Sequence, residues 1–344
     1  MILPRFDVLL PETVEEASSM LAEHSEKGVR VLAGGTDLLV DLRRPIIPQH
    51  IPRCDGCPTH PDGSVRSTID CSLWESDPLM APDGPLRRAL EDPQHSRPAY
   101  LVSLQRLKEL KGISILKGGG LRIGAMTTIA EIERSPEIRR NWMALSDGAD
   151  SLGSPLVRNR GTLGGNIANA RPAADTAIPT IALGGRIHLR SPSGERIVAA
   201  EEFPKGPGLS VIQPDEILTH VEYPSPAPHS GSAYYKLANR KALEISMVGV
   251  AVWLTLDKPG GKITDSRIAL GAVGPTPILA ESAAKILMGK VPDDDIIAKA
   301  ARAAADDSRP IDDHRGSVWY RLQMVELLTN RMIRLALSRA LENK

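Results

Sequence analysis

The sequence carries no excess of charge of either sign. Its 344 residues include 42 lysines and arginines and 42 aspartates and glutamates, so the formal net charge at pH 7 is zero. No basic stripe with interleaved aromatic residues is present, which argues against a nucleic-acid-binding surface. No apolar run approaches the length of about 18 residues that a membrane-spanning helix needs. We therefore expect neither a nucleic-acid partner nor a membrane span.

Cysteine is also scarce, and it is confined to one segment. All three cysteines lie between residues 54 and 71, too few for a disulfide framework in a chain of this size. The N-terminal sequence MILPRFDVLLPETVEE lacks the basic region and long apolar core of a signal peptide. These features favour a soluble cytoplasmic protein, and the length of the chain suggests two or three domains.

Two glycine-rich segments carry the clearest chemical signal. The first is VLAGGTDL (31–38), and the second is RNRGTLGGNIANARPAADT (158–176). Glycines can adopt positive φ and let several N–H groups converge on an oxygen-rich ligand. Neither segment has P-loop spacing or a G-x-G-x-x-G motif that opens a helix. Each alone could be a surface turn, but two such segments, each with a threonine, favour a split cradle for a pyrophosphate.

Hydrophobic periodicity predicts the elements around these segments. A strand at 29–33 leads into the first glycine turn, and a helix begins at 38, where its N-terminal N–H groups would face an anion. Further strands are expected at 99–102, 113–115, 121–123, 186–189, 196–198 and 217–221, and helices at 14–21, 128–135 and 141–152. From about 230, three strands (233–237, 247–256, 267–273) precede helical segments at 278–289, 294–306 and 317–341, which predicts an α+β unit.

The two glycine segments resemble those of a known family. AGGTDLL (33–39) followed by RNRGTLGGNIANARPAAD (158–175) is similar to the FAD-binding medium subunit of the molybdenum hydroxylases, which include xanthine dehydrogenase, aerobic carbon monoxide dehydrogenase and 4-hydroxybenzoyl-CoA reductase. The similarity continues at 234–252, 267–277 and 308–328. The resemblance implies an α+β fold, with a two-lobed FAD-binding domain of the PCMH/VAO type at 1–229. A C-terminal flavoprotein domain at 230–344 would combine a three-stranded antiparallel sheet with a helical bundle.

The resemblance also implies a FAD site. The matching cofactor-binding positions are Val31, Leu32, Ala33, Gly34, Gly35, Thr36, Asp37, Leu38, Leu152, Thr162, Gly165, Asn166, Ala168, Asn169, Asp175, Leu218 and Lys236. In this assignment the first segment binds the pyrophosphate, and Asp175 bonds a hydroxyl in the cofactor site. Lys236 would lie near the flavin and stabilise its anionic reduced form. From the residues alone, Asp175 could instead cap a helix at 176–183, and Lys236 could be a solvated surface lysine.

No acid–base or nucleophile motif stands out. The eight histidines show no H-x-x-x-H spacing, and a G-x-S-x-G motif is absent. This fits an oxidoreductase subunit whose bound flavin supplies the reactive atom. The resemblance implies electron transfer between iron–sulfur clusters of a partner and an external acceptor. The partners would be a large molybdenum-cofactor subunit and a small [2Fe–2S] subunit, in a heterotrimer or its dimer.

Two other functions remain open from the residues. One is a stand-alone FAD-dependent oxidoreductase that acts directly on a small substrate. The other is a non-enzymatic assembly module in which the glycine segments are only turns. Bound FAD would exclude the assembly module, and copurification with a molybdenum subunit would separate the two flavoprotein alternatives.

Residues 45–98 depart from the family pattern. They contain ten of the 28 prolines, so no long regular element can run through them. The motif C-D-G-C-P-T-H (54–60) could bring two thiolates onto one metal atom, and a third cysteine follows. We predict an iron–sulfur cluster or zinc in this insert. The expected ligands are Cys54, Cys57, Cys71 and His60, with His50, Asp55 or an outside group as alternatives for the fourth position. The other interpretations are a loop of reduced thiols, a docking arm for another subunit, and a redox dithiol, which lacks a βαβ context.

Overall fold

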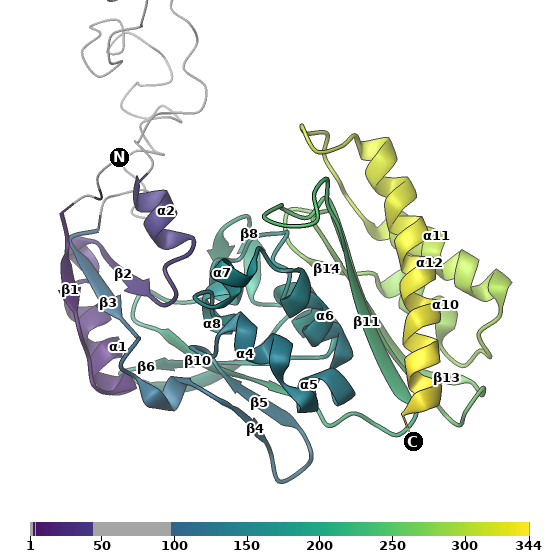
Figure 1. Ribbon diagram of the computed structural model, residues 1–344, viewed down its shortest axis with the longest axis horizontal. Helices are drawn as coiled ribbons and strands as arrows, with labels where there is room; N and C mark the ends of the chain where they lie inside the picture. The colour runs from purple at the N-terminus through teal and green to yellow at the C-terminus, as the bar shows by residue number, and fades with distance from the viewer. Residues whose placement is uncertain (1–2, 4, 44–97, 344) are drawn as a thin grey trace, which may run out of the picture.

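The computed structural model describes residues 3, 5–43 and 98–343 (Figure 1). The expected metal ligands Cys54, Cys57, Cys71 and His60 fall in the stretch 44–97, outside the described residues, so the metal centre of the insert stays a prediction. The described chain contains three main sheets and the helices that pack between and around them. None of its helices is long and apolar enough to cross a membrane.

The first domain begins with a three-stranded parallel sheet. Its order is β1 (Asp7–Leu9), β3 (Tyr100–Ser103) and β2 (Val29–Leu32), so β3 lies in the middle. The helix α1 (Val14–Glu23) packs on this sheet through a buried face that includes Leu21. The first glycine segment leaves the C-terminal end of β2 and leads into α2 (Leu38–Arg43), as expected. The short 3₁₀ helices η1 (Ser25–Lys27) and η5 (Lys108–Leu110) complete this lobe.

A five-stranded antiparallel sheet forms the second lobe. Its strands, in spatial order, are β4 (Ile113–Ile115), β5 (Leu121–Gly124), β10 (Ile217–Tyr223), β6 (Arg186–Ser191) and β7 (Gly194–Ala199). The strands β4 and β5 form one hairpin, and β6 and β7 form another. A bulge interrupts β10, because Leu218 pairs with Leu189 whereas His220 already pairs with His188. Thr219 is therefore an extra residue in this strand.

Short helices cover the apolar face of this sheet. They are α4 (Ile129–Arg134), α5 (Pro136–Asn141), α6 (Met143–Ser151), α7 (Pro155–Arg158), α8 (Leu163–Ala168) and α9 (Ala177–Ala182). A capping box begins α4, since the side chains of Thr128 and Glu131 each accept a bond from the other residue's backbone N–H group. The predicted helix at 141–152 is divided, because Trp142 ends α5 outside helical geometry and α6 starts at the next residue. A two-stranded ribbon, β8 (Pro204–Gly206) and β9 (Leu209–Ser210), follows β7.

The C-terminal sheet is antiparallel and has four strands rather than the three predicted. Its order is β11 (Ser230–Leu237), β12 (Val248–Leu256), β13 (Ile263–Gly271) and β14 (Ile278–Leu279). The prediction missed β14 because two residues directly after a proline are too short to show alternation. The helices that follow are α10 (Glu281–Leu287), α11 (Asp294–Asp307) and α12 (Val318–Glu342).

This sheet is covered by helices on both faces. The helix α12 packs against β11 and β12 from one side, and α6 and α9 of the first domain contact the sheet as well (Figure 1). Double coverage explains why β12 reads as a nearly continuous apolar run, VGVAVWLTL. Asp147 of α6 fixes the arrangement by accepting bonds from Tyr234 N (3.1 Å) and Arg339 Nη1 (2.6 Å). The last helix is thereby tied to the first domain.

Candidate functional site

The two glycine segments meet through their backbones. An ideal Cβ atom on Gly34 would lie 2.0 Å from the carbonyl oxygen of Arg160 and 3.2 Å from Cα of Gly161. A Cβ atom on Gly161 would in turn lie 3.8 Å from Oγ1 of Thr36. Only glycine at position 34 allows this approach, so the structure brings together the two segments that the sequence paired.

The second segment differs from the flexible turn that its glycines suggested. Among the glycines of the two segments, only Gly35 has positive φ, at 75°. Residues 163–168 form α8, and Thr162 caps it by accepting a bond from Gly165 N at 3.1 Å. The positive φ expected of the glycines in this segment was therefore wrong. Its glycines serve close packing instead, since a Cβ atom on Gly164 would lie 2.6 Å from Cβ of Ala125.

Backbone donors for an anion come from the first segment. Within the part of the chain that the structure describes, the N–H groups of Gly34, Gly35 and Thr36 have no acceptor. In the second segment the N–H groups of Gly161 and Gly164 already donate to carbonyl oxygens of Val157 and Ala125. The convergence of backbone N–H groups expected for both segments is thus confined to the first.

The second segment supplies side-chain donors. Asn166 Oδ1 accepts bonds from Thr176 N (3.3 Å) and Thr176 Oγ1 (2.6 Å). These two bonds hold the side-chain oxygen of Asn166 toward Thr176. The Nδ2 hydrogens of Asn166 therefore point away from Thr176 and are not used in these bonds. The Thr162 oxygen accepts from Gly165 N, which leaves its hydrogen available to a ligand. The second segment can therefore donate side-chain hydrogen bonds to a ligand that also contacts the first segment.

A buried ion pair lies next to this segment. Lys236 Nζ is 2.7 Å from Asp175 Oδ2, and both side chains are only 8% exposed. Tyr234 donates its hydroxyl hydrogen to Asp175 Oδ1 at 2.9 Å, and Lys236 also donates to Ser151 O at 3.3 Å. Lys236 is therefore not a surface lysine. Nor does Asp175 cap α9, because the cap position is Thr176 and it makes no side-chain cap bond.

The protonation of this cluster follows from its burial. Burial raises the pKa of Asp175, and the charge and hydrogen bonds of Lys236 and Tyr234 oppose that rise. Burial also raises the pKa of Tyr234 well above its usual value, and the adjacent carboxylate adds to the effect. Tyr234 thus keeps its proton and acts as a donor. Sequence reasoning missed Tyr234, although its spacing of two from Lys236 on one strand placed both on the same face.

The remaining predicted site residues occupy less specific positions. Leu152 is 8% exposed and directly follows Ser151, so it lies beside the ion pair. Leu218 is 5% exposed and packs in the main core, where it pairs with Leu189 across the sheet. The others follow the two segments: Val31 and Leu32 in β2, Ala33 in the turn, Asp37 and Leu38 at the start of α2, and Ala168 and Asn169 at the end of α8.

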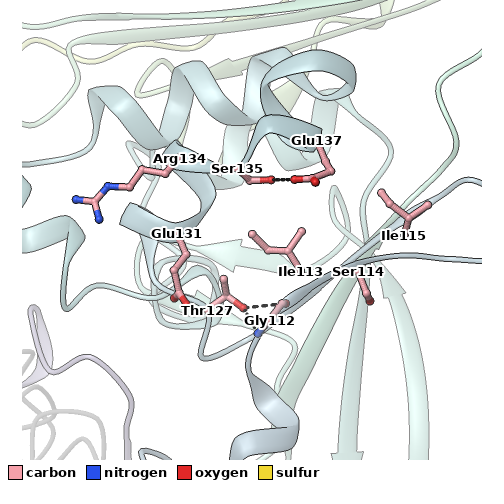
Figure 2. Close-up of a pocket in the computed structure, with 9 residues that line it drawn as sticks. All are labelled: Gly112, Ile113, Ser114, Ile115, Thr127, Glu131, Arg134, Ser135 and Glu137. Atoms are coloured by element: carbon pink, nitrogen blue, oxygen red, sulfur yellow. Dashed lines mark hydrogen bonds between the residues drawn. The ribbon is translucent and has the colours of Figure 1, made fainter.

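A separate cleft of about 540 Å³ lies away from these residues (Figure 2). Its walls are the strand β4 and the junction of α4 and α5. Several of the polar groups that line it are already hydrogen-bonded. Thr127 Oγ1 exchanges bonds with the backbone of Gly112, and Ser135 donates to Glu137 at 2.8 Å. The glycine segments, by contrast, combine backbone and side-chain donors.

Comparison with known proteins decides the family. A family model described as the FAD binding domain in molybdopterin dehydrogenase matches residues 89–226, and one described as the CO dehydrogenase flavoprotein C-terminal domain matches 233–336. A putative xanthine dehydrogenase FAD-binding subunit of Escherichia coli is 33% identical over 247 residues, which covers 72% of this chain and 84% of the relative. The chain belongs to the FAD-binding subunits of the molybdenum hydroxylases.

Two further relatives extend over almost the whole chain. The carbon monoxide dehydrogenase medium chain of Hydrogenophaga pseudoflava is 30% identical over 339 residues, 98% of this chain and 99% of the relative. A solved carbon monoxide dehydrogenase from the same organism, which lacks the Mo-pyranopterin moiety of its cofactor, matches with a TM-score of 0.78 and 28% identity. The match covers 98% of this chain and 99% of that one. The protein is thus an oxidoreductase flavoprotein subunit that uses FAD, as the resemblance implied.

Proposed function

We propose that this medium subunit holds one FAD against the two glycine segments and works in a complex with a large molybdenum-cofactor subunit and a small [2Fe–2S] subunit. The assembly would be a heterotrimer or its dimer. Bound FAD would take up electrons from iron–sulfur clusters of the partner and release them to an external acceptor, or work in the opposite direction. The observation that carries the proposal is the backbone approach of Gly34 to Arg160, beside three N–H groups that have no acceptor among the described residues.

The chain's own residues fit a dinucleotide. The N–H groups of Gly34, Gly35 and Thr36 would bind pyrophosphate oxygens without adding net charge. Thr162, Asn166 and Asn169 would add side-chain donors from α8 and its two caps. We assign residues 1–229 to the FAD-binding domain, with 45–98 as an insert, and residues 230–344 to the C-terminal domain. The strand β11 of the C-terminal domain would bring Lys236 to the site.

The ion pair changes the role expected of Lys236. An isolated buried cation would stabilise the anionic reduced form of a nearby flavin. Asp175 at 2.7 Å offsets most of that field, so the pair acts as a fixed dipole rather than as a single positive charge. Lys236 also has a structural role, because its bond to Ser151 O joins β11 to the end of α6. We propose that Asp175 and Tyr234 position Lys236 for the cofactor.

The test is to purify the untagged complex and analyse flavin, metals and subunits together. Acid denaturation should release about one FAD per chain into the supernatant, since nothing in the sequence assigns a covalent attachment site. FMN, or flavin retained on the protein, would contradict non-covalent FAD binding. Copurification with molybdenum and iron–sulfur subunits is expected. A flavin-bearing chain that oxidises a small substrate without them would be a stand-alone oxidoreductase.

A further inference from the structure

A second cluster of chemically active side chains lies on the five-stranded sheet. His188 of β6 and His220 of β10 are direct cross-strand neighbours, and Glu222 lies two residues further along β10. The imidazole rings stack with centroids 4.0 Å apart. His188 Nε2 is 3.3 Å from Glu222 Oε2, and His220 Nε2 is 3.6 Å from Glu222 Oε1. One donor atom from each of the three residues lies within 4.8 Å of the others.

We propose that His188, His220 and Glu222 bind a divalent transition-metal ion of the zinc class. Two imidazoles and a carboxylate are a ligand set that suits Zn²⁺. Metal–ligand bonds of about 2.0–2.1 Å at tetrahedral angles place neighbouring ligand atoms roughly 3.3 Å apart. Both distances between a histidine nitrogen and a Glu222 oxygen are already near that value. Three protein ligands leave one position for water or for a donor from another molecule.

The surrounding hydrogen bonds prepare His220 as a ligand. Thr219 Oγ1 is 2.9 Å from His220 Nδ1 and donates its own hydrogen to His188 O at 3.2 Å. The hydroxyl can then only accept from Nδ1–H, which fixes the tautomer with an unprotonated Nε2. This bond is of the kind that orients metal-bound imidazoles in proteins. Thr219 is the bulge residue of β10, so the bulge itself supplies the orienting group.

His188 presents an uncommitted atom to the same point. Its Nε2 is hidden from solvent and has no hydrogen-bond partner among the described residues, despite the nearby carboxylate. A buried ring nitrogen without a partner is costly, and a metal ion would satisfy it.

The charges that face the cluster partly compensate one another. Arg122 on β5 and Arg186 on β6 stand opposite Glu222, and Glu195 on β7 offsets them. The three side chains of the cluster are 14%, 13% and 28% exposed, so a small ion can reach them although a large ligand cannot bury itself there. The sequence alone did not indicate this site, because His188 and His220 come together only through the register of two paired strands.

The experiment is equilibrium dialysis of the full-length, flavin-loaded complex against Zn²⁺. A background variant with Cys54, Cys57 and Cys71 changed to Ser removes the thiolates that could also bind zinc. In that background, His188→Ala and His220→Ala should each lose about one bound Zn²⁺ per chain. Glu222→Gln should weaken binding at least about tenfold.

His314→Ala is the matched control, because His314 is an exposed histidine outside the cluster. It should keep the full zinc stoichiometry. Flavin content and circular dichroism report whether each variant is folded, and they separate failure of this site from failure of the FAD site. If the three cluster variants bind as much Zn²⁺ as His314→Ala with the same affinity, the proposed metal site does not exist. Glu222→Gln keeps the test valid if either alanine variant fails to fold.

Discussion

Gly34 and Arg160 lie so close together that the backbone carbonyl of Arg160 occupies the place of a Gly34 side chain. An ideal Cβ atom there would be 2.0 Å from that oxygen, a separation that real Cβ atoms do not show. The neighbouring atoms are also backbone, so no side chain can rotate away. The fit of the two glycine segments therefore depends on one missing methyl group.

Gly34→Ala should separate the two segments and lower the flavin content of the purified subunit. Forced overpacking of this kind typically costs about 1–3 kcal/mol, which should appear as a lower melting temperature. Gly118→Ala is the matched control, because a Cβ atom at Gly118 would meet nothing within 4 Å. Equal flavin content in the two purified variants would remove the Gly34 contact from the FAD site.

Thr162→Ala should affect both stability and cofactor binding. Loss of the cap bond to Gly165 N should cost about 1 kcal/mol of unfolding free energy. Loss of the free hydroxyl hydrogen should also weaken FAD affinity. Ser317→Ala is the control, since Ser317 caps α12 with a similar bond to Tyr320 N at 3.2 Å. Flavin titration of the apoproteins should show weaker binding only for Thr162→Ala, and equal affinities would contradict its role as a donor.

The Asp175–Lys236 pair should behave as a coupled unit. Asp175→Asn leaves the Lys236 ammonium buried without its counter-charge, which typically costs about 3–5 kcal/mol. Adding Lys236→Met should restore much of that stability. Denaturant unfolding of both single variants and the double variant measures the coupling. Additive effects would mean that the two groups do not interact. Lys299→Met, which breaks an exposed pair with Asp295, should change little.

Asp313 should make stability depend on pH in the acid range. It accepts a bond from Arg321 Nη2 at 2.6 Å, and the Arg321 side chain is 2% exposed. Burial tends to raise the pKa of Asp313, but the bonds from Arg315 N and Arg321 outweigh it and hold this pKa below 3.8. As the pH falls, Asp313 is therefore protonated in the unfolded chain before it is protonated in the folded chain. The stabilisation is complete well above pH 3.8 and is lost as the pH falls through the folded value.

Asp313→Asn checks this expectation. The variant should be less stable than the wild type at pH 7 by about 2 kcal/mol, because a hydrogen bond between two charged groups is weakened to one with a neutral acceptor. Urea unfolding at several pH values should show the difference shrinking as the solution is made more acidic than pH 3.8. A difference that stays constant down to acid unfolding would show that Asp313 does not titrate as its contacts indicate.

Periodicity was sufficient to locate most strands and the long helices, since their buried faces repeat at intervals that sequence shows directly. It did not reveal α8, because Gly164 and Gly165 are poor helix formers and the helix depends on the Thr162 cap and on packing against Ala125. Glycine content located the two glycine segments, and the family resemblance assigned them to a FAD site. Neither source gave the spacing between them, which depends on backbone contacts across the fold.

Partners distant in the chain were the least predictable part of the site. Tyr234 and Asp175 are bonded although they are 59 residues apart, and local patterns say nothing about such pairs. The same limit concealed the cluster of His188, His220 and Glu222, which forms only when β6 and β10 are placed in register. Sequence reasoning found Asp175 and Lys236 separately, but their burial as a pair required the structure.

The extra residue in β10 restricts how this strand can evolve. In a regular strand, residues two apart point to the same side, so Leu218 and His220 would share one face. The bulge at Thr219 lets Leu218 enter the core while His220 points to the opposite side. Deleting Thr219 would restore regular alternation and leave Leu218 and His220 on opposite faces, but it would remove the hydroxyl that bonds His220 Nδ1. A deletion elsewhere in β10 would instead turn the side chains beyond it to the wrong face, so we expect the strand to keep its length on either side of the bulge.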